Sequence, residues 1–237
     1  MISNSEDAEL CKQILAVATT VRRPISLDEL TSLVDTPDGL PDDPGSLQEI
    51  VELCGSFLTL QERTVYFIHQ SAKDFLLGKA SDEASNGASE EAFDRVFPSG
   101  IENVHHFLLS RSLDAMSTTL RHDMYGLGAL GFPTDNVRVL DLDPLATVRY
   151  SCVYWVDYLC DAVSGTNTKQ DDHLQDGGVV HIFLKTKYLY WLEALSLVRA
   201  MPEGVIAILI RNCVGTSLRT VLNNMIQVLL SQQFTPK

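Results

Sequence analysis

Three residues that could act together in acyl-transfer chemistry, His69, Ser71 and Asp74, lie close to one another in the sequence. A serine nucleophile, a histidine base and a carboxylate that orients the histidine are the members of a hydrolase triad. Such triads collect their members from distant loops, however, and the chain has no GxSxG nucleophile elbow. We therefore assign Ser71 and Asp74 to a helix start and predict that the chain is not an enzyme.

A glycine pattern, Gly126-Leu-Gly128-Ala-Leu-Gly131, matches the GxGxxG fingerprint of dinucleotide-binding proteins. That fingerprint works when a strand precedes it and a helix follows, because the pyrophosphate then meets the helix N-terminus. Here Phe132-Pro133 follows and no βαβ pattern surrounds the glycines. The pattern is typical of a loop between helices, and we predict no cofactor.

Four potential zinc ligands, Cys152, Cys160, His173 and His181, lie in the second half of the chain. Their gaps match no zinc finger or ribbon, and Cys152 lies in the apolar run YSCVYWVDYL. We interpret the cysteines as packing residues and predict no metal.

The elements around His69 are typical of a winged helix. Apolar residues at helical spacing predict a helix over about 7–20. Ser26, Ser46 and Ser71 each precede a carboxylate by three positions, which is the capping-box signal of a helix start. Between the second and third of these, alternation around residues 58–60 and 65–67 predicts a β-hairpin whose turn lacks glycine. The fold class we expect is mainly α, with a winged-helix domain over 1–80.

The second half of the sequence is predicted to be helical. The small, acidic residues 81–92 are a predicted linker, and an α-helical domain is expected over 93–231. Its helices include aromatic-rich segments over about 145–163 and 179–200. The aromatic residues fall on more than one helical face, so part of this surface is expected to meet another domain.

The charge of the chain limits the classes of partner that it can bind. The formal net charge is −13, and from Asp35 to Glu52 there are six acidic residues and no Lys or Arg. A recognition helix of this kind would repel phosphates, so we predict no nucleic-acid binding. No signal peptide is apparent, the longest apolar run (204–210) is too short to cross a bilayer, and the five cysteines form no CxxC pair. We predict a cytoplasmic protein with reduced thiols and no membrane partner.

Several segments of the sequence resemble those of one known protein family. LCKQIL, RRPISLDEL, ELCGSFLTL and TVYFIHQSAKDFLL resemble the winged helix of fungal NACHT-domain proteins, the NLR-like vegetative-incompatibility switches. FPSGIENVHHFLL, DLDPLATVRYSCVYWVDYL and YLYWLEALSLVRAMPEGV resemble the helical segment that comes after it, so the likeness covers about Asp7 to Val205. The chain lacks the family's P-loop, since no GxxxxGK[ST] occurs, and its C-terminal repeats. These departures imply a fragment, a degenerate gene product or a truncated gene model, which by itself is not expected to hydrolyse ATP.

The resemblance also implies a function. The segment would be a non-catalytic regulatory part of a NACHT-type signal-transduction NTPase, which packs on a nucleotide-binding domain in cis or trans and relays its state. His69 occupies the place of a histidine that contacts the β-phosphate of ADP in such switches, so we expect it to sense a nucleotide only when a NACHT domain is present. Gln70 departs from the usual acid at the next position. The alternative is a free-standing protein-interaction module, such as one that binds related NLR-like proteins, with no nucleotide role.

Overall fold

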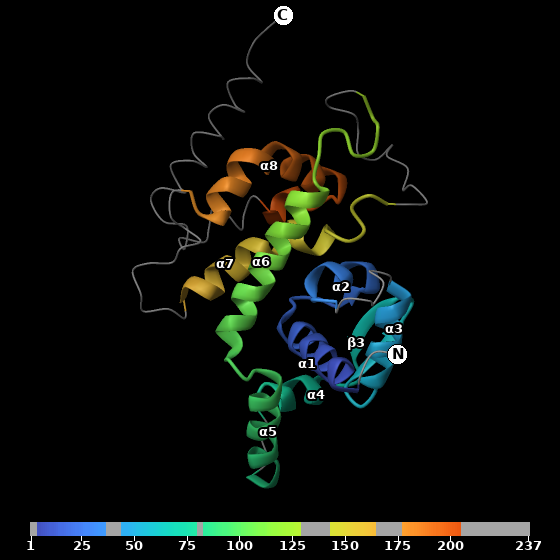
Figure 1. The fold of residues 1–237 in the computed structure, drawn as a ribbon, viewed down its shortest axis with the longest axis vertical. Helices are drawn as coiled ribbons and strands as arrows, with labels where there is room; N and C mark the ends of the chain where they lie inside the picture. Colours follow the sequence, from blue (N-terminus) through green and yellow to red (C-terminus); the bar gives the residue numbers. More distant parts are fainter. Residues whose placement is uncertain (1–3, 37–43, 80–82, 129–142, 165–176, 205–237) are drawn as a thin grey trace, which may run out of the picture.

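A computed structural model describes residues 4–36, 44–79, 83–128, 143–164 and 177–204 of the chain (Figure 1). The described part is mainly helical, as predicted, and holds one small antiparallel sheet. Its first half comprises α1 (Asn4–Thr20), β1 (Ile25–Ser26), α2 (Leu27–Leu33), α3 (Pro44–Leu53), β2 (Leu58–Gln61), β3 (Thr64–Phe67) and α4 (Gln70–Leu76). Its second half comprises α5 (Glu83–Val96), α6 (Ile101–Thr119), α7 (Arg149–Ser164) and α8 (Val179–Leu197).

The first half is a winged helix. Strand β3 lies between β1 and β2, and both pairs are antiparallel. The β2–β3 hairpin was predicted, whereas β1 was not, because two residues are too short to show alternation. Its turn residues Glu62 and Arg63 have φ of 49° and 63°, so both central positions are left-handed. Left-handed geometry at both positions is a requirement of a type I′ turn, and it fits the twist of the strands.

Only one of the three predicted capping boxes forms. Ser26 accepts from the backbone N–H of Glu29, and the Glu29 carboxylate accepts from the backbone N–H of Ser26. Helix α3 begins at Pro44, so Ser46 lies inside its first turn, and the N-cap of α4 is His69 rather than Ser71. The boxes at Ser46 and Ser71 were therefore wrong, because the helices start earlier than their serines.

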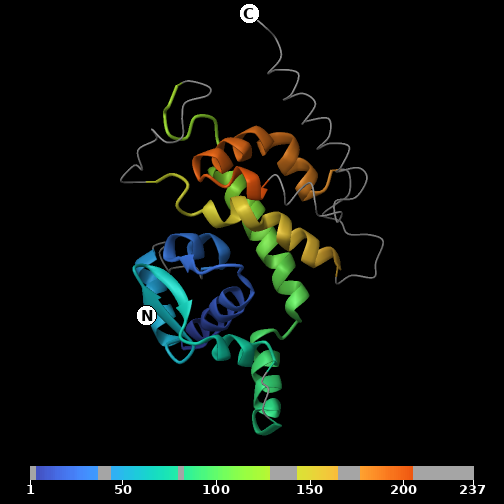
Figure 2. The same ribbon diagram turned by 180° about the vertical axis from the view of Figure 1, so that it is seen from behind.

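The second half is a layer of long helices beside the winged helix (Figures 1 and 2). Helices α6 and α7 pack against each other along much of their length, and α8 crosses them. Helix α7 begins at Arg149, later than predicted, because residues 144–148 form turns. Helix α5 covers most of the segment predicted as a linker and stands beside α4 at one end of the molecule. The division into 1–80, 81–92 and 93–231 remains a prediction.

One hydrophobic core extends through both halves. It joins α1, α2, α3 and the sheet to α6, α7 and α8. At its centre the Trp155 ring meets those of Phe183 and Trp191 edge-on, at centroid distances of 5.5 and 5.8 Å. The indole N–H of Trp191 donates to the Cys152 carbonyl at 2.8 Å. These aromatic contacts fix α7 against α8.

Two outcomes concern the cysteines. Cys152 is fully buried in α7, as predicted for a packing residue, and burial raises the pKa of its thiol to about 12. Cys160 is disulfide-bonded, so the prediction of reduced thiols was wrong for this residue. His173 lies outside the described residues, and within the described ranges no cluster of three His, Cys, Asp or Glu side chains could hold a metal ion.

Candidate functional site

His69 lies where the sheet meets helix α4. Strand β3 ends at Phe67, and His69 has extended backbone angles (φ −144°, ψ 151°) as the N-cap residue of α4. Its side chain makes no capping hydrogen bond and is exposed. The Asp74 carboxylate accepts instead from the Gln70 side-chain amide at 3.1 Å. The geometry thus pairs Asp74 with Gln70 and presents His69 at the surface.

Two exposed apolar side chains precede His69 closely in the chain. Tyr66 and Ile68 are 38% and 41% exposed. Tyr66 and Ile68 lie within three positions of His69 in the chain. Exposed large apolar side chains close together are common where a protein meets a partner. The His69 edge therefore has the character of a contact surface.

A second functional feature is the turn between α1 and β1, which ties the winged helix to α7. The backbone N–H of Arg22 donates to the Tyr150 hydroxyl at 2.9 Å, and its guanidinium is paired with Asp161. Tyr150 is fully buried, and its hydroxyl also meets that of Tyr158. One turn of the winged helix is thus hydrogen-bonded to the middle of the long-helix layer.

Arg23, the next residue, occupies the same junction. Its guanidinium donates to both carboxylate oxygens of Glu29, at 2.5 and 2.9 Å, and lies over the rings of Tyr150 and Tyr154 at 5.2 and 6.0 Å. Burial lowers the pKa of Arg23, but the hydrogen bonds and charge of Glu29 outweigh burial and raise it. The Glu29 side chain is only 4% exposed and that of Arg23 is 39% exposed, so a buried carboxylate, which also closes the capping box of α2, is paired with a partly exposed cation. Such a pair holds its geometry because either charge left alone would be costly.

The far side of the winged helix makes further contacts with the second half. The Ser32 hydroxyl donates to the Thr147 carbonyl at 2.8 Å. Arg111 on α6 donates to the Val34 carbonyl at 2.9 Å and pairs with Asp35 at 3.3 Å. Together with the Arg22–Arg23 turn, these contacts hold the winged helix at two separate points.

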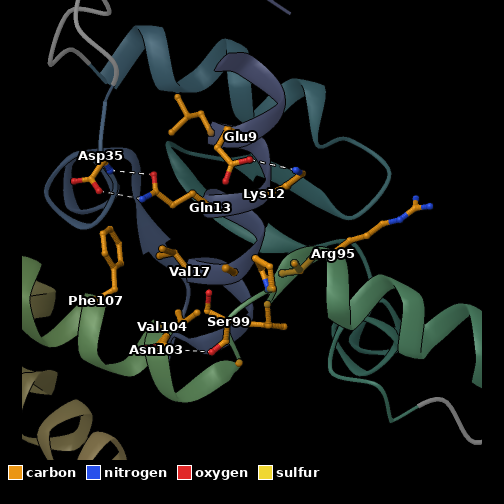
Figure 3. A pocket seen from close by; sticks show the side chains of 16 residues that line it. Glu9, Lys12, Gln13, Val17, Asp35, Arg95, Ser99, Asn103, Val104 and Phe107 are labelled. Atoms are coloured by element: carbon orange, nitrogen blue, oxygen red, sulfur yellow. Dashed lines mark hydrogen bonds and ion pairs between the residues drawn. The ribbon is translucent and has the colours of Figure 1, made fainter. Parts of the chain in front are cut away.

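A groove runs between α1 and the turn that joins α5 to α6 (Figure 3). Its volume is about 470 Å³, within the usual range for ligand pockets. Apolar side chains such as Val17, Phe97 and Phe107 line it, and Glu9, Lys12, Asp35 and Arg95 lie around it. The Gln13 amide bonds Asp35 across one edge. Both signs of charge occur, so the groove shows no preference for an anion or a cation.

The other sequence-predicted candidates do not come together into a site. Gly126 and Gly128 have φ of 64° and 65° and lie in a loop after α6, where the Asp123 carboxylate accepts from the backbone N–H of Leu127 and Gly128. The prediction of a loop is confirmed for these two glycines, and Gly131 lies outside the described residues. His105 and His106 are both half-buried on α6.

The fold and these contacts define the class of protein. Three helices and a three-stranded antiparallel sheet with a projecting hairpin make a winged-helix protein, here joined through its α1–β1 turn to a layer of long helices. None of the described helices has the length and apolarity that a membrane span needs.

Comparison with known proteins shows which sequences this chain is similar to. Residues 1–89 match the family described as GPI inositol-deacylase, winged helix domain. The chain is 69% identical over 207 residues to vegetative incompatibility protein HET-E-1 of Podospora anserina. That match covers 87% of this chain and 15% of the relative, so the chain corresponds to a small part of that protein. No solved structure matches. The resemblance to the fungal vegetative-incompatibility proteins is confirmed.

Sequence reasoning missed the junction at Arg22 and Arg23. Arg22 and Arg23 lie in the segment RRPISLDEL. Tyr150, which they meet, lies in VRYSCVYWVDYL, more than a hundred positions later in the chain. The available signal for the junction was the pair of adjacent arginines that precedes Pro24 in an acidic chain. Neither segment alone indicates which aromatic residue the arginines meet.

Proposed function

We propose that this chain is a non-catalytic regulatory segment of a NACHT-type signal-transduction NTPase. It would pack on a nucleotide-binding domain, supplied in cis or in trans in the cytoplasm, and relay the state of that domain. The observation that carries the proposal is the Arg22–Arg23 junction with Tyr150, in a chain that is 69% identical to part of a vegetative incompatibility protein. A relay needs a body that moves as a unit, and this junction joins the winged helix to the long helices.

The surface for the nucleotide-binding domain would be the His69 edge. His69 is exposed, and Ile68 and Tyr66 offer apolar area beside it. An imidazole can donate a hydrogen bond to an anion, so His69 would contact a nucleotide phosphate only when another domain presents one. When the nucleotide changes, that contact would be lost and the joined body would move.

The test is isothermal titration with ADP, with and without a cognate NACHT domain. We expect tighter ADP binding by the NACHT domain when the chain is present than when it is absent. His69→Ala should remove about ten-fold of that gain, the worth of one charge-assisted hydrogen bond. His122→Ala, a change to an exposed histidine after α6, is the matched control.

Equal ADP affinity with and without the chain would contradict the relay. A loss in His69→Ala that His122→Ala reproduces would contradict the sensor role of His69. The rigid-body part is tested by spin labels on α3 and α8: their separation should stay constant on nucleotide exchange. A change in that separation would show that the junction opens.

A second function is favoured by one observation, the exposed apolar residues that lie away from the His69 edge. Ile182 and Leu189 on α8 are 54% and 59% exposed. They lie two helical turns apart on one side of the helix, as in surfaces that bind another helix. A free-standing interaction module would use such a face and need no nucleotide. Association that is lost in Ile182→Glu and is indifferent to ADP would favour this function.

A further inference from the structure

A small pocket beside the Arg22–Arg23 turn has an unusual lining. It lies between the end of α1, strand β3 and helix α4, and its volume is about 250 Å³. Arg22, Arg23 and Lys73 line it, and none of the described residues that line it is acidic. The chain as a whole carries a net charge of −13. Three cations around one acid-free cavity are therefore a strong local reversal of the overall charge.

The two arginines keep hydrogen-bonding capacity toward this cavity. Arg22 uses a terminal nitrogen for Asp161, and Arg23 donates to Glu29 and to the Pro24 carbonyl, while both arginine side chains are 39% exposed. Neither carboxylate lines the pocket. A guanidinium has donors in a planar fork, so an arginine held on one edge by a carboxylate can present others to a second anion. The carboxylates thus position the arginines as well as neutralise them.

Lys73 is the least compensated of the three cations. Its ammonium lies 3.5 Å from the Val21 carbonyl, a long contact, and it makes no salt bridge within 4 Å among the described residues. Burial first, and then the charge of Arg22, lower the pKa of Lys73, while Asp74 opposes them. An anion in the pocket would relieve the repulsion between Lys73 and Arg22.

The remaining walls strengthen electrostatic attraction. Val21, Ile25 and Val65 supply apolar surface, which reduces the local dielectric constant and makes a charge-assisted hydrogen bond stronger than in water. The volume lies below the range typical of drug-sized ligands. The pocket therefore fits a small, multiply charged group.

We propose that this pocket, formed by Arg22, Arg23 and Lys73, binds a phosphate group. Lys73 carries a charge that no carboxylate compensates within 4 Å among the described residues, and the two arginines add donors beside it, so the pocket suits an anion with several acceptor oxygens, as a phosphate has. The arginines supply forked donors and the lysine a point charge, the combination that phosphate sites use. The site lies within this chain and needs no second domain, so its binding can be measured apart from the relay proposed above, although Arg22, Arg23 and Tyr66 belong to both.

The experiment is calorimetric titration of the purified chain with sodium diphosphate, inorganic phosphate, ADP and sodium acetate at low ionic strength. We expect saturable binding of diphosphate, weaker binding of phosphate and none of acetate, and we expect added salt to weaken the binding. ADP distinguishes the source of the phosphate: tighter binding than diphosphate identifies a nucleotide, and weaker binding identifies a free phosphate compound. Both results support the phosphate class.

Variants locate the site. Lys73→Gln should weaken diphosphate binding about ten-fold or more, the effect of losing one charge-assisted hydrogen bond. Lys73→Arg keeps the charge and should bind within about two-fold of the wild type. Lys79→Gln removes an exposed charge near the end of α4 that does not line the pocket, and is the matched control. Thermal unfolding of each variant without ligand checks that the fold is kept.

Three results would overturn the proposal. The first is a lack of saturation by diphosphate up to roughly 10 mM, a concentration at which even a weak site is filled. The second is acetate binding as strong as phosphate binding. The third is an equal loss of diphosphate affinity in Lys73→Gln and Lys79→Gln. The last result would show attraction to the surface in general rather than to this pocket.

Discussion

The backbone N–H of Arg22 donates to the hydroxyl of Tyr150 across 128 positions of the chain, at 2.9 Å. This bond directly connects the α1–β1 turn to α7. Tyr150 is fully buried and also meets the hydroxyl of Tyr158. Burial raises the pKa of Tyr150 to about 12, so the phenol stays neutral throughout the physiological range.

Tyr150→Phe tests this connection. The change removes the acceptor for the Arg22 N–H and the partner of Tyr158, and leaves two buried polar groups unpaired. We expect the free energy of unfolding to fall by about 2 kcal/mol, as measured by urea denaturation. Tyr154→Phe is the control, because Tyr154 is half-buried and its ring would still lie beside Arg23. A cost below about 0.5 kcal/mol for Tyr150→Phe would contradict the importance of the bond.

Removal of the cation that pairs with the buried Glu29 carboxylate should cost more. Arg23→Met leaves the Glu29 carboxylate buried without its cation, and we expect a loss of about 3 kcal/mol in the free energy of unfolding. The control is Arg63→Met, which breaks a more exposed pair with Asp28 at 3.3 Å and should cost less than about 1 kcal/mol.

A double substitution separates the penalty of a lone charge from the worth of the pair. Arg23→Met with Glu29→Leu removes both charges and should recover most of the stability lost by Arg23→Met alone. If the double variant is less stable than Arg23→Met, the hydrogen bond from Ser26 to Glu29 is the larger contribution.

Short-range sequence patterns encode much of the fold, but they do not encode the junction between the Arg22–Arg23 turn and α7. The 3.6-residue spacing of Leu10, Ile14 and Val17 defines α1, and all three are buried. The serine and carboxylate three positions apart at Ser26 correctly mark α2. The start of α4 was missed because His69 caps it without a side-chain bond, which leaves no signal in residue type. His69 lies between β3 and α4, where the local pattern predicts a strand followed by a helix, whereas the Arg22 and Arg23 contacts depend on packing between distant segments.

The stability of the start of α7 should depend on pH through Asp143. Burial raises the pKa of this carboxyl, but hydrogen bonds from the Tyr125 hydroxyl, the Leu145 N–H and the Arg149 guanidinium outweigh burial and hold the pKa below its usual range. Because the folded-state pKa lies below the unfolded-state value, the contribution is complete above the unfolded-state pKa. It is lost as the pH falls through the folded-state pKa.

We therefore expect the midpoint of urea unfolding to fall as the pH decreases below about 5. Asp143→Asn should reduce the slope of this fall, which is the acid limb of the stability curve. Asp114→Asn, at an exposed position on α6, should leave the slope unchanged. Parallel acid limbs in the wild type and in Asp143→Asn would show that other carboxyl groups set the slope.

The hairpin turn offers a stabilising change. Glu62 and Arg63 both have positive φ, which strains residues that carry a Cβ, whereas asparagine and glycine adopt this geometry readily. We expect Glu62→Asn with Arg63→Gly to raise the free energy of unfolding by about 1 kcal/mol, even though the exposed ion pair of Arg63 with Asp28 is lost. Thermal unfolding measures the gain. Glu49→Gly, an exposed glycine substitution within helix α3, is the control for glycine itself and should lower the stability by about 1 kcal/mol. If both variants lose stability, the turn is not strained, and its left-handed residues are held by the pairing of β2 with β3 at no cost.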